Sequence, residues 1–170
     1  MNKTKKLTFL AFMSALGVVA LFLGGITRVL DLTAVMVATA LIFVCFEETR
    51  YYALLSYGVI GALAFLLPIE KSVAVEFLIF GIYPAVKPVF EKAPKVISFA
   101  LKFVFMTASF VGLTLLLQFV LGYPEVWYIN AIFCVAGVFI YLVFDRFLTR
   151  LKYYYRLKLR HQLRLDRFFG

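Results

Sequence analysis

Few polar side chains in this sequence could do chemistry, and most of them lie near the ends of long apolar runs. The clearest is Glu76, a carboxylate that follows apolar residues 73–75 inside such a run. Ionisable side chains are costly at membrane depth and commonly mark the path of a solute or ion there. Glu76 could therefore bind a solute, or it could simply pair with Lys71 or Arg28.

Other polar and aromatic side chains lie near the same ends of the apolar runs. If the three turns that carry them converge, they would line a shallow cup for a small polar or aromatic solute. The candidate solute-binding residues are Arg28, Glu70, Glu76, Thr114, Gln118, Glu125, Trp127, Tyr128 and Asn130. The alternative for Trp127 and Tyr128 is an aromatic belt at the membrane interface.

The sequence contains no recognised catalytic or nucleotide-binding motif. There is no Ser/His/Asp set, no HExxH and no glycine loop for a phosphate. Cys45 and Cys134 lie in separate apolar runs, as small buried hydrophobic residues do, and His161 stands alone among basic residues. We therefore predict a protein that is not an enzyme and has no cofactor and no metal site.

The composition indicates an integral membrane protein. Of the 170 residues, 64% are hydrophobic and 16% are charged, and the mean hydropathy is +0.97. Soluble domains are about half apolar and about a quarter charged, so the excess apolar surface must face lipid. The net charge of +9 comes from residues at the ends of apolar runs and in the C-terminal tail. That distribution is typical of membrane topology and argues against a nucleic-acid partner.

Six apolar stretches predict an all-α fold, an integral membrane bundle of six transmembrane helices. Their ranges are 7–26, 32–46, 51–67, 73–86, 96–121 and 127–144. Pro84 and Pro88 should break the fourth helix near its end, and the carbonyl groups that they leave unpaired need partners from protein or water. Lys102, two turns into the fifth helix, is expected to extend to the cytoplasmic surface.

The basic residues predict the orientation. Of the 18 lysines and arginines, Arg28 and Lys71 alone lie at the turns of one side. Because positive charge stays in the cytoplasm, both termini should be cytoplasmic, in a multi-pass protein of the inner (cytoplasmic) membrane. Residues 1–145 would form the transmembrane domain, and residues 146–170 a basic cytoplasmic tail with an amphipathic helix on the lipid surface.

The first stretch carries small side chains on two nearly opposite helical faces. The faces consist of Ala11, Ser14 and Ala15, and of Gly17, Ala20 and Gly24. Small residues let helices approach closely in lipid. One face could pack within the bundle and the other against a partner, or both could pack within the bundle.

The predicted bundle, with both termini inside and without a nucleotide site, resembles the substrate-binding S component of energy-coupling-factor (ECF) transporters. The closest local match is the segment from Ala11 to Ala15, which fits the AxxxA pattern of that family. The resemblance implies that Ala11, Ser14 and Ala15 face a transmembrane coupling subunit, while the glycine face packs within the bundle.

By this resemblance the protein would capture a vitamin or related micronutrient outside the cell. It would then topple within the membrane while two cytoplasmic ATPases, acting through the coupling subunit, drive release. Nickel and cobalt members use an amino-terminal histidine, whereas residues 2–6 are Asn-Lys-Thr-Lys-Lys here, so metal transport is not expected. No pattern of the riboflavin, thiamin, biotin or folate members is evident, and the solute stays open.

Two other classes remain as alternatives. A structural membrane protein such as the MreD-like component of the rod-shape machinery is also small and spans the membrane about six times. A lipid-modifying enzyme would need an acidic or histidine cluster at the membrane surface, and Glu47 and Glu48 are the one inner acidic pair. Adjacent carboxylates at a helix end stabilise a turn more often than they catalyse, so this class ranks last.

Overall fold

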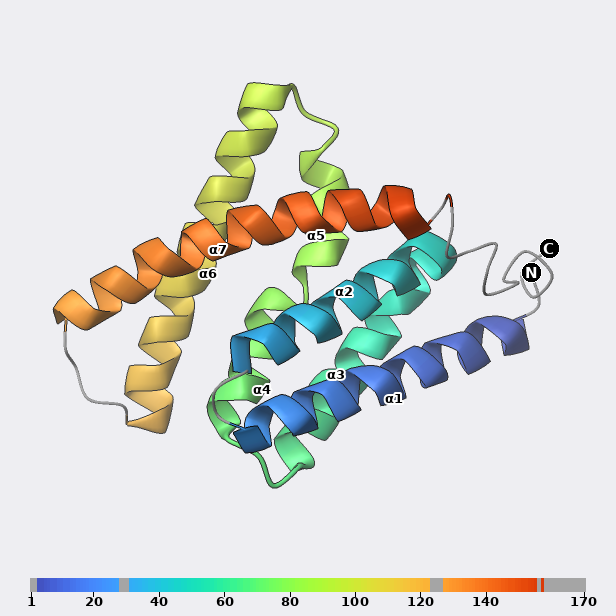
Figure 1. Cartoon of the computed structure of the whole chain (residues 1–170), viewed down its shortest axis with the longest axis horizontal. Coiled ribbons are helices and arrows are strands. Elements are labelled where there is room, and N and C mark those ends of the chain that lie inside the picture. The colour runs from blue at the N-terminus through green and yellow to red at the C-terminus, as the bar shows by residue number, and fades with distance from the viewer. Residues whose placement is uncertain (1–2, 28–30, 123–126, 156, 158–170) are drawn as a thin grey trace.

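The computed structural model describes residues 3–27, 31–122, 127–155 and 157, and this part of the chain consists of helices joined by short turns, without a strand. The helices are α1 (Lys3–Thr27), α2 (Asp31–Thr49), the short 3-10 helix η1 (Arg50–Tyr52), α3 (Ala53–Leu66), α4 (Lys71–Phe80), α5 (Tyr83–Phe90), α6 (Lys95–Leu121) and α7 (Trp127–Tyr154). Figure 1 shows their arrangement. The prediction of an all-α fold is confirmed for this part of the chain.

Each of the six predicted stretches is helical over most of its length, but six membrane crossings are not established. Five helical segments of the described chain are long and apolar enough to cross a membrane. Their ranges are Lys3–Thr27, Asp31–Leu66, Lys71–Phe90, Lys95–Phe119 and Asn130–Tyr154. The second of these contains both α2 and α3. At 14 residues, α3 is about 21 Å long, which is short of the roughly 30 Å of a bilayer core.

Close packing of α1 against α3 depends on glycines. A Cβ at Gly17 would lie 2.7 Å from Ile60 Cδ1 of α3, and one at Gly25 would lie 2.9 Å from Cβ of Ile69, in the turn that follows α3. Ser56 of α3 also donates its hydroxyl to the Leu10 carbonyl of α1, at 3.3 Å. Because these contacts follow the same order along both segments, α1 and α3 run in the same direction. Their backbones approach closely, as helices do in lipid where side chains are small.

The chain reverses direction between α2 and α3 at Arg50, whose φ of 53° lies in the left-handed region. Residues with a side chain adopt this region rarely, and mostly in turns. The N–H of Ala53 then donates to the carbonyls of Arg50 and Tyr51, which begins the next helix. One left-handed residue thus separates α2 from the helical turn that leads into α3.

The predicted break in the fourth stretch is present, but it lies before the prolines. α4 ends at Phe80, Gly81 and Ile82 form a turn, and α5 begins at Tyr83. Pro84 occupies the first turn of α5, where a missing N–H is tolerated. Its fixed φ thus starts the second helix, whereas the sequence analysis expected the prolines to end the first.

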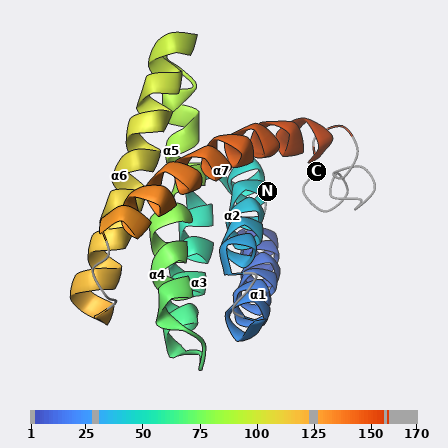
Figure 2. The same cartoon turned by 60° about the vertical axis from the view of Figure 1, so that its left-hand side comes forward.

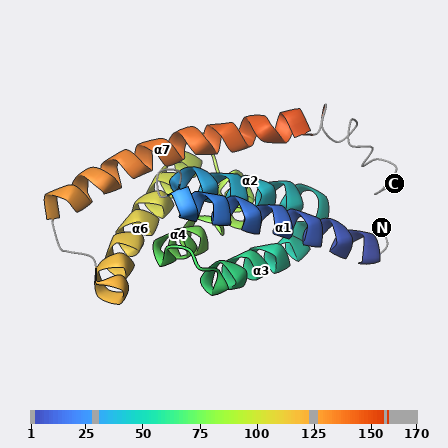
Figure 3. The same ribbon diagram turned by 60° about the horizontal axis from the view of Figure 1, so that its bottom comes forward.

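α7 crosses α6 and runs past α2 (Figures 1, 2 and 3). Where α4, α6 and α7 meet, the core is aromatic. The Phe80 ring lies 4.7 Å from Phe110 of α6 and 4.6 Å from Tyr141 of α7, measured between ring centroids. Large aromatic side chains thus fill the space between α4, α6 and α7.

The beginning of α1 and the end of α7 lie at the same end of the molecule. Phe9 and Leu10 of α1 form a small apolar cluster with Cys45 and Tyr155. That both termini are cytoplasmic stays a prediction. α7 also continues unbroken through Asp145, so the expected boundary at residues 145–146 falls inside a helix. Residues 156 and 158–170 of the expected tail are outside the described residues.

Replacing Gly137 of α7 by alanine should destabilise the protein. The new Cβ would lie 2.2 Å from Cε1 of the buried Phe110 ring, which is rigid. We expect the free energy of unfolding in mixed micelles to fall by about 1–3 kcal/mol, the usual cost of overpacking a core. Gly112→Ala in α6 is the matched control, because a Cβ there meets nothing within 4 Å. It should instead gain up to about 1 kcal/mol from helix propensity. Equal stability of the two variants would contradict this packing.

Candidate functional site

A buried network of ionic groups joins α5, α6 and α7. Lys87 of α5 is 1% exposed and forms an ion pair with Oδ1 of Asp145 in α7. Oδ1 also accepts a hydrogen bond from the Tyr83 hydroxyl at 2.5 Å, and Oδ2 accepts one from Lys102 of α6 at 2.9 Å. Both oxygens of this carboxylate therefore have positively charged or polar donors, as a buried charge requires.

A second carboxylate balances the charge of the network. Glu91 lies 3.2 Å from the Lys87 ammonium and 3.5 Å from that of Lys102. Lys87 further donates to the Asp145 carbonyl at 3.0 Å and to the Thr149 hydroxyl at 2.9 Å. Two ammonium groups thus face two carboxylates, and the three donors of Lys87 are saturated. This network therefore acts as an ionic clamp that holds three helices together. Its lysines and carboxylates are already paired with one another.

This network is not among the sequence predictions. Lys87 and Lys102 belong there to the basic residues that set topology, and Asp145 is the last residue of the predicted transmembrane domain. The expectation that Lys102 reaches the cytoplasmic surface is wrong, because its side chain is 11% exposed and pairs with Asp145. The available signal was two lysines and one aspartate near apolar runs, since intramembrane charges are normally paired.

The hydrogen bond that Pro84 cannot make is replaced from α7. Pro84 has no N–H to donate to the carbonyl four residues earlier, which is that of Phe80. The hydroxyl of the buried Tyr141 donates to this carbonyl at 3.2 Å. The nearby Leu78 carbonyl accepts a hydrogen bond from Tyr57 of α3 at 2.5 Å. The expectation that protein groups must satisfy carbonyls at this break is thereby confirmed.

The predicted solute-binding residues Glu70 and Glu76 lie close together at the opposite end of the bundle. Glu76 interacts electrostatically with both Glu70 and Asp31, the first residue of α2. Its Oε2 atom is buried and accepts no hydrogen bond from any residue that the structure describes. Lys71, the suggested partner of Glu76, instead donates to the carbonyls of Phe65 and Leu67, at 2.6 and 3.1 Å. A buried carboxylate oxygen is thus left at this end of α4.

The other candidates of the predicted cup lie on α6 and α7. Thr114 donates to the Phe110 carbonyl of its own helix at 2.7 Å and lies 3.6 Å from Cys134 Sγ. Gln118 and Asn130 are half-buried, and Tyr128 is exposed. Arg28 and Glu125 are outside the described residues, as is the side chain of Trp127. Of the predicted cup, the structure thus brings Glu70 and Glu76 together.

The small faces of α1 differ in exposure. Ala11 and Ala15 are exposed, whereas Gly17 and Gly24 are buried. Ser14, predicted to lie on the partner face, is 6% exposed and belongs to the buried side of the helix. The exposed small pair of α1 is therefore Ala11 and Ala15, without Ser14.

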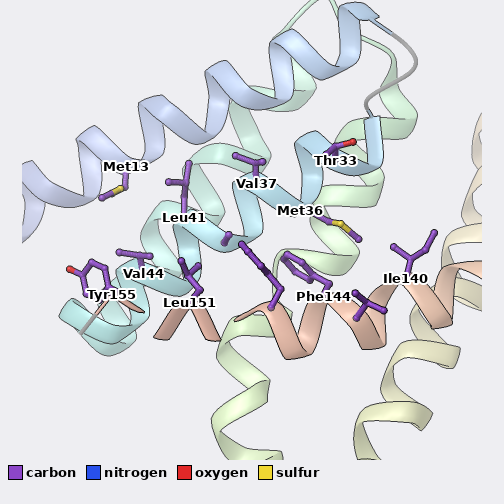
Figure 4. A pocket seen from close by; sticks show the side chains of 13 residues that line it. Met13, Thr33, Met36, Val37, Leu41, Val44, Ile140, Phe144, Leu151 and Tyr155 are labelled. Atoms are coloured by element: carbon purple, nitrogen blue, oxygen red, sulfur yellow. The ribbon is translucent and has the colours of Figure 1, made fainter. Parts of the chain in front are cut away.

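A partly open hollow of about 760 Å³ lies between α2 and α7, closed at one edge by Met13 of α1 (Figure 4). It is distinct from the predicted cup. Its lining is apolar apart from the hydroxyls of Thr33 and Tyr155, and includes Met36, Val37, Leu41, Val143, Phe144 and Phe147. Within the described chain, no group of three or more His, Cys, Asp or Glu side chains is arranged to hold a metal ion.

The fold defines an all-α protein with helices suited to a membrane. Comparisons with protein-family models, curated proteins and solved structures give no match.

Replacing Asp145 by asparagine should strongly destabilise the α5–α6–α7 junction. The substitution leaves two buried ammonium groups facing one carboxylate, and removing one partner of a buried ion pair costs about 3–5 kcal/mol. Unfolding in mixed micelles measures the loss, with the adjacent exposed Arg146→Gln as the control. The double variant Asp145→Leu/Lys87→Met should be more stable than Asp145→Asn, since it removes both charges. The same stability for Asp145→Asn and wild type would refute the clamp.

Proposed function

We propose that this chain is the substrate-binding subunit of an ECF-type importer. In this proposal the subunit captures a vitamin or related micronutrient at the outer face of the cytoplasmic membrane. The observation that carries the proposal is the arrangement of α1. Its glycines pack within the bundle, while Ala11 and Ala15 are exposed on another face. An exposed pair of small residues one turn apart gives a partner helix room for close approach.

The end of α4 supports a solute site. Glu76 keeps a buried carboxylate oxygen that accepts no hydrogen bond within the described residues, beside Glu70 and Asp31. A buried polar group without a partner is costly, and a solute that donates a hydrogen bond or carries positive charge would recover that free energy. Glu76 is accordingly the residue we place at the centre of the proposed site, with Glu70 beside it.

Energy for release would come from partner subunits in this proposal. The sequence has no phosphate-binding glycine loop, so two cytoplasmic ATPases would act through the transmembrane coupling subunit. The exposed face of α1 would then contact the coupling subunit, through which ATP hydrolysis drives release of the captured solute.

A second candidate is a scaffold protein of the cell envelope, similar to the MreD-like component. One observation favours it: the hollow between α2 and α7 is apolar and separate from Glu76. A protein that works through contacts within the membrane needs apolar surfaces of this kind and no polar solute cup. Purification in gentle detergent separates the two candidates, because a coupling subunit with its ATPases or a retained vitamin indicates the importer, and cell-shape proteins indicate the scaffold.

Replacing Ala11 and Ala15 together by leucine should weaken binding of the coupling subunit. Two larger side chains would hold the partner helix away, and overpacking of about 1–3 kcal/mol corresponds to a loss of roughly 5- to 150-fold in affinity. Co-purification with the co-expressed coupling subunit and ATPases measures it. Ala100→Leu/Ala108→Leu, at exposed positions of α6, is the matched control. Unchanged co-purification of a folded Ala11/Ala15 variant would count against the proposal.

Replacing Glu76 by glutamine or alanine should lower the amount of solute that the purified protein retains. Glutamine keeps the shape and removes the charge, and an interaction with a charged group is worth about 1.5–3 kcal/mol. Mass spectrometry of small molecules released from the purified protein is the measurement. Glu47→Gln is the matched control, since Glu47 is a carboxylate of 12% exposure at the other end of α2, paired with Lys152. Undiminished solute on a folded Glu76→Ala variant would remove Glu76 from the site.

A further inference from the structure

The hollow between α2 and α7 is a groove with the dimensions of one membrane leaflet. Its lining runs from Thr33 to Val44 on α2 and from Ile140 on α7 to Tyr155, the residue that follows α7. At 1.5 Å per residue these ranges measure about 16 Å and about 22 Å. The hydrocarbon core of one leaflet is about 15 Å thick. Both helices belong to segments that are apolar and long enough to cross a membrane, so the groove is placed to be filled by an apolar group.

The lining of the groove does not suit a partner helix. Helices in lipid pack through small residues, whereas Ala40 is the one small residue of this lining and Met13 and Met36 are long and flexible. A thin, flexible occupant fits better.

Basic side chains lie beyond one end of the groove. Lys6 precedes Met13 of α1 by seven residues, and Arg150 follows Val143 of α7 by seven residues. Seven residues are two helical turns, so each basic residue lies on nearly the same face as its lining residue, about 10 Å further toward the same end of the molecule. Arg150 is exposed, and Lys6 lies 5.2 Å from the centroid of the Tyr52 ring.

The acidic side chains at this end are already engaged. Glu47 pairs with Lys152 at 2.9 Å, and Glu48 accepts the Tyr155 hydroxyl at 3.0 Å. The remaining charge facing a molecule that leaves the groove here is therefore positive, and it matches a phosphate headgroup.

We propose that this groove binds one acyl chain of an anionic phospholipid, whose phosphate headgroup lies beside Lys6 and Arg150. The chain fills apolar space between α2 and α7 that the protein itself leaves open, so the lipid holds the two helices at their separation. Such a site serves an importer subunit and a scaffold equally, and it stands apart from the solute site at Glu76.

Native mass spectrometry of the protein released from nanodiscs tests the proposal. The nanodiscs contain equal amounts of phosphatidylglycerol and phosphatidylethanolamine. The wild-type protein should retain one phospholipid, predominantly phosphatidylglycerol. Ala40→Trp fills the groove and should reduce retention roughly tenfold, the equivalent of about 1.4 kcal/mol. Ala62→Trp, at an exposed position of α3, should retain the lipid as wild type does.

A second variant tests the headgroup contact. Lys6→Gln/Arg150→Gln should retain a lipid but lose the preference for phosphatidylglycerol by roughly fivefold for each charge removed. Lys92→Gln/Lys95→Gln is its control and should keep the preference, because both lysines are exposed, Lys92 in the turn before α6 and Lys95 at its first residue.

A measurement on the wild-type chain tests the proposal independently of whether the variants fold. A phospholipid with a photoreactive group in its acyl chain should label peptides from residues 33–44 and 140–151. Labelling of other helices alone, or equal retention by Ala40→Trp and wild type, would overturn the proposal. So would a lipid-free dimer joined through α2 and α7, which would make a second copy of the chain the occupant.

Discussion

The pairing of Lys87 with Asp145 is the interaction on which the arrangement of the last three helices depends. An ammonium that is 1% exposed would be prohibitive in apolar surroundings without a carboxylate beside it. The requirement fixes α5 against α7 at one point, and Lys102 then brings α6 to the same carboxylate. Because a charge in this position tolerates little displacement, the clamp determines how α7 crosses the bundle, and the aromatic core around Tyr141 packs within that crossing.

The same rule explains how the proline break is tolerated. Pro84 removes a donor from the Phe80 carbonyl, and in an apolar interior the carbonyl needs another. Tyr141 can supply it because the ionic clamp holds α7 against this turn. The ring of Tyr141 packs against Phe80 while its hydroxyl satisfies the backbone of the same residue. Two local defects, a buried lysine and a missing N–H, are thus compensated by one neighbouring helix.

Local sequence patterns allowed the helices to be predicted, but they could not predict the long-range contacts between helices. Apolar runs and their charged ends determine where each helix lies, because hydropathy and turn chemistry act over a few residues. The pairing of Asp145 with Lys87 joins residues 58 apart in sequence, a distance over which spacing carries no geometric information. Ser14 shows the same limit within one helix. Helical periodicity placed it with Ala11 and Ala15, yet which side of α1 becomes buried is decided by α2 and α3.

The two ends of the bundle differ in what they leave available for binding, and this difference bears on function. At the end that holds Asp145 and Glu91, the carboxylates are matched by lysines, and the network is a poor ligand site because any ligand must first displace an internal partner. At the end that holds Glu76, the described residues leave a buried carboxylate oxygen without a hydrogen bond. A ligand gains more binding free energy at a buried polar group that is not already paired with another group of the protein. A solute site is therefore favoured at α4 and not at the more heavily charged clamp, even though the clamp contains more ionisable groups.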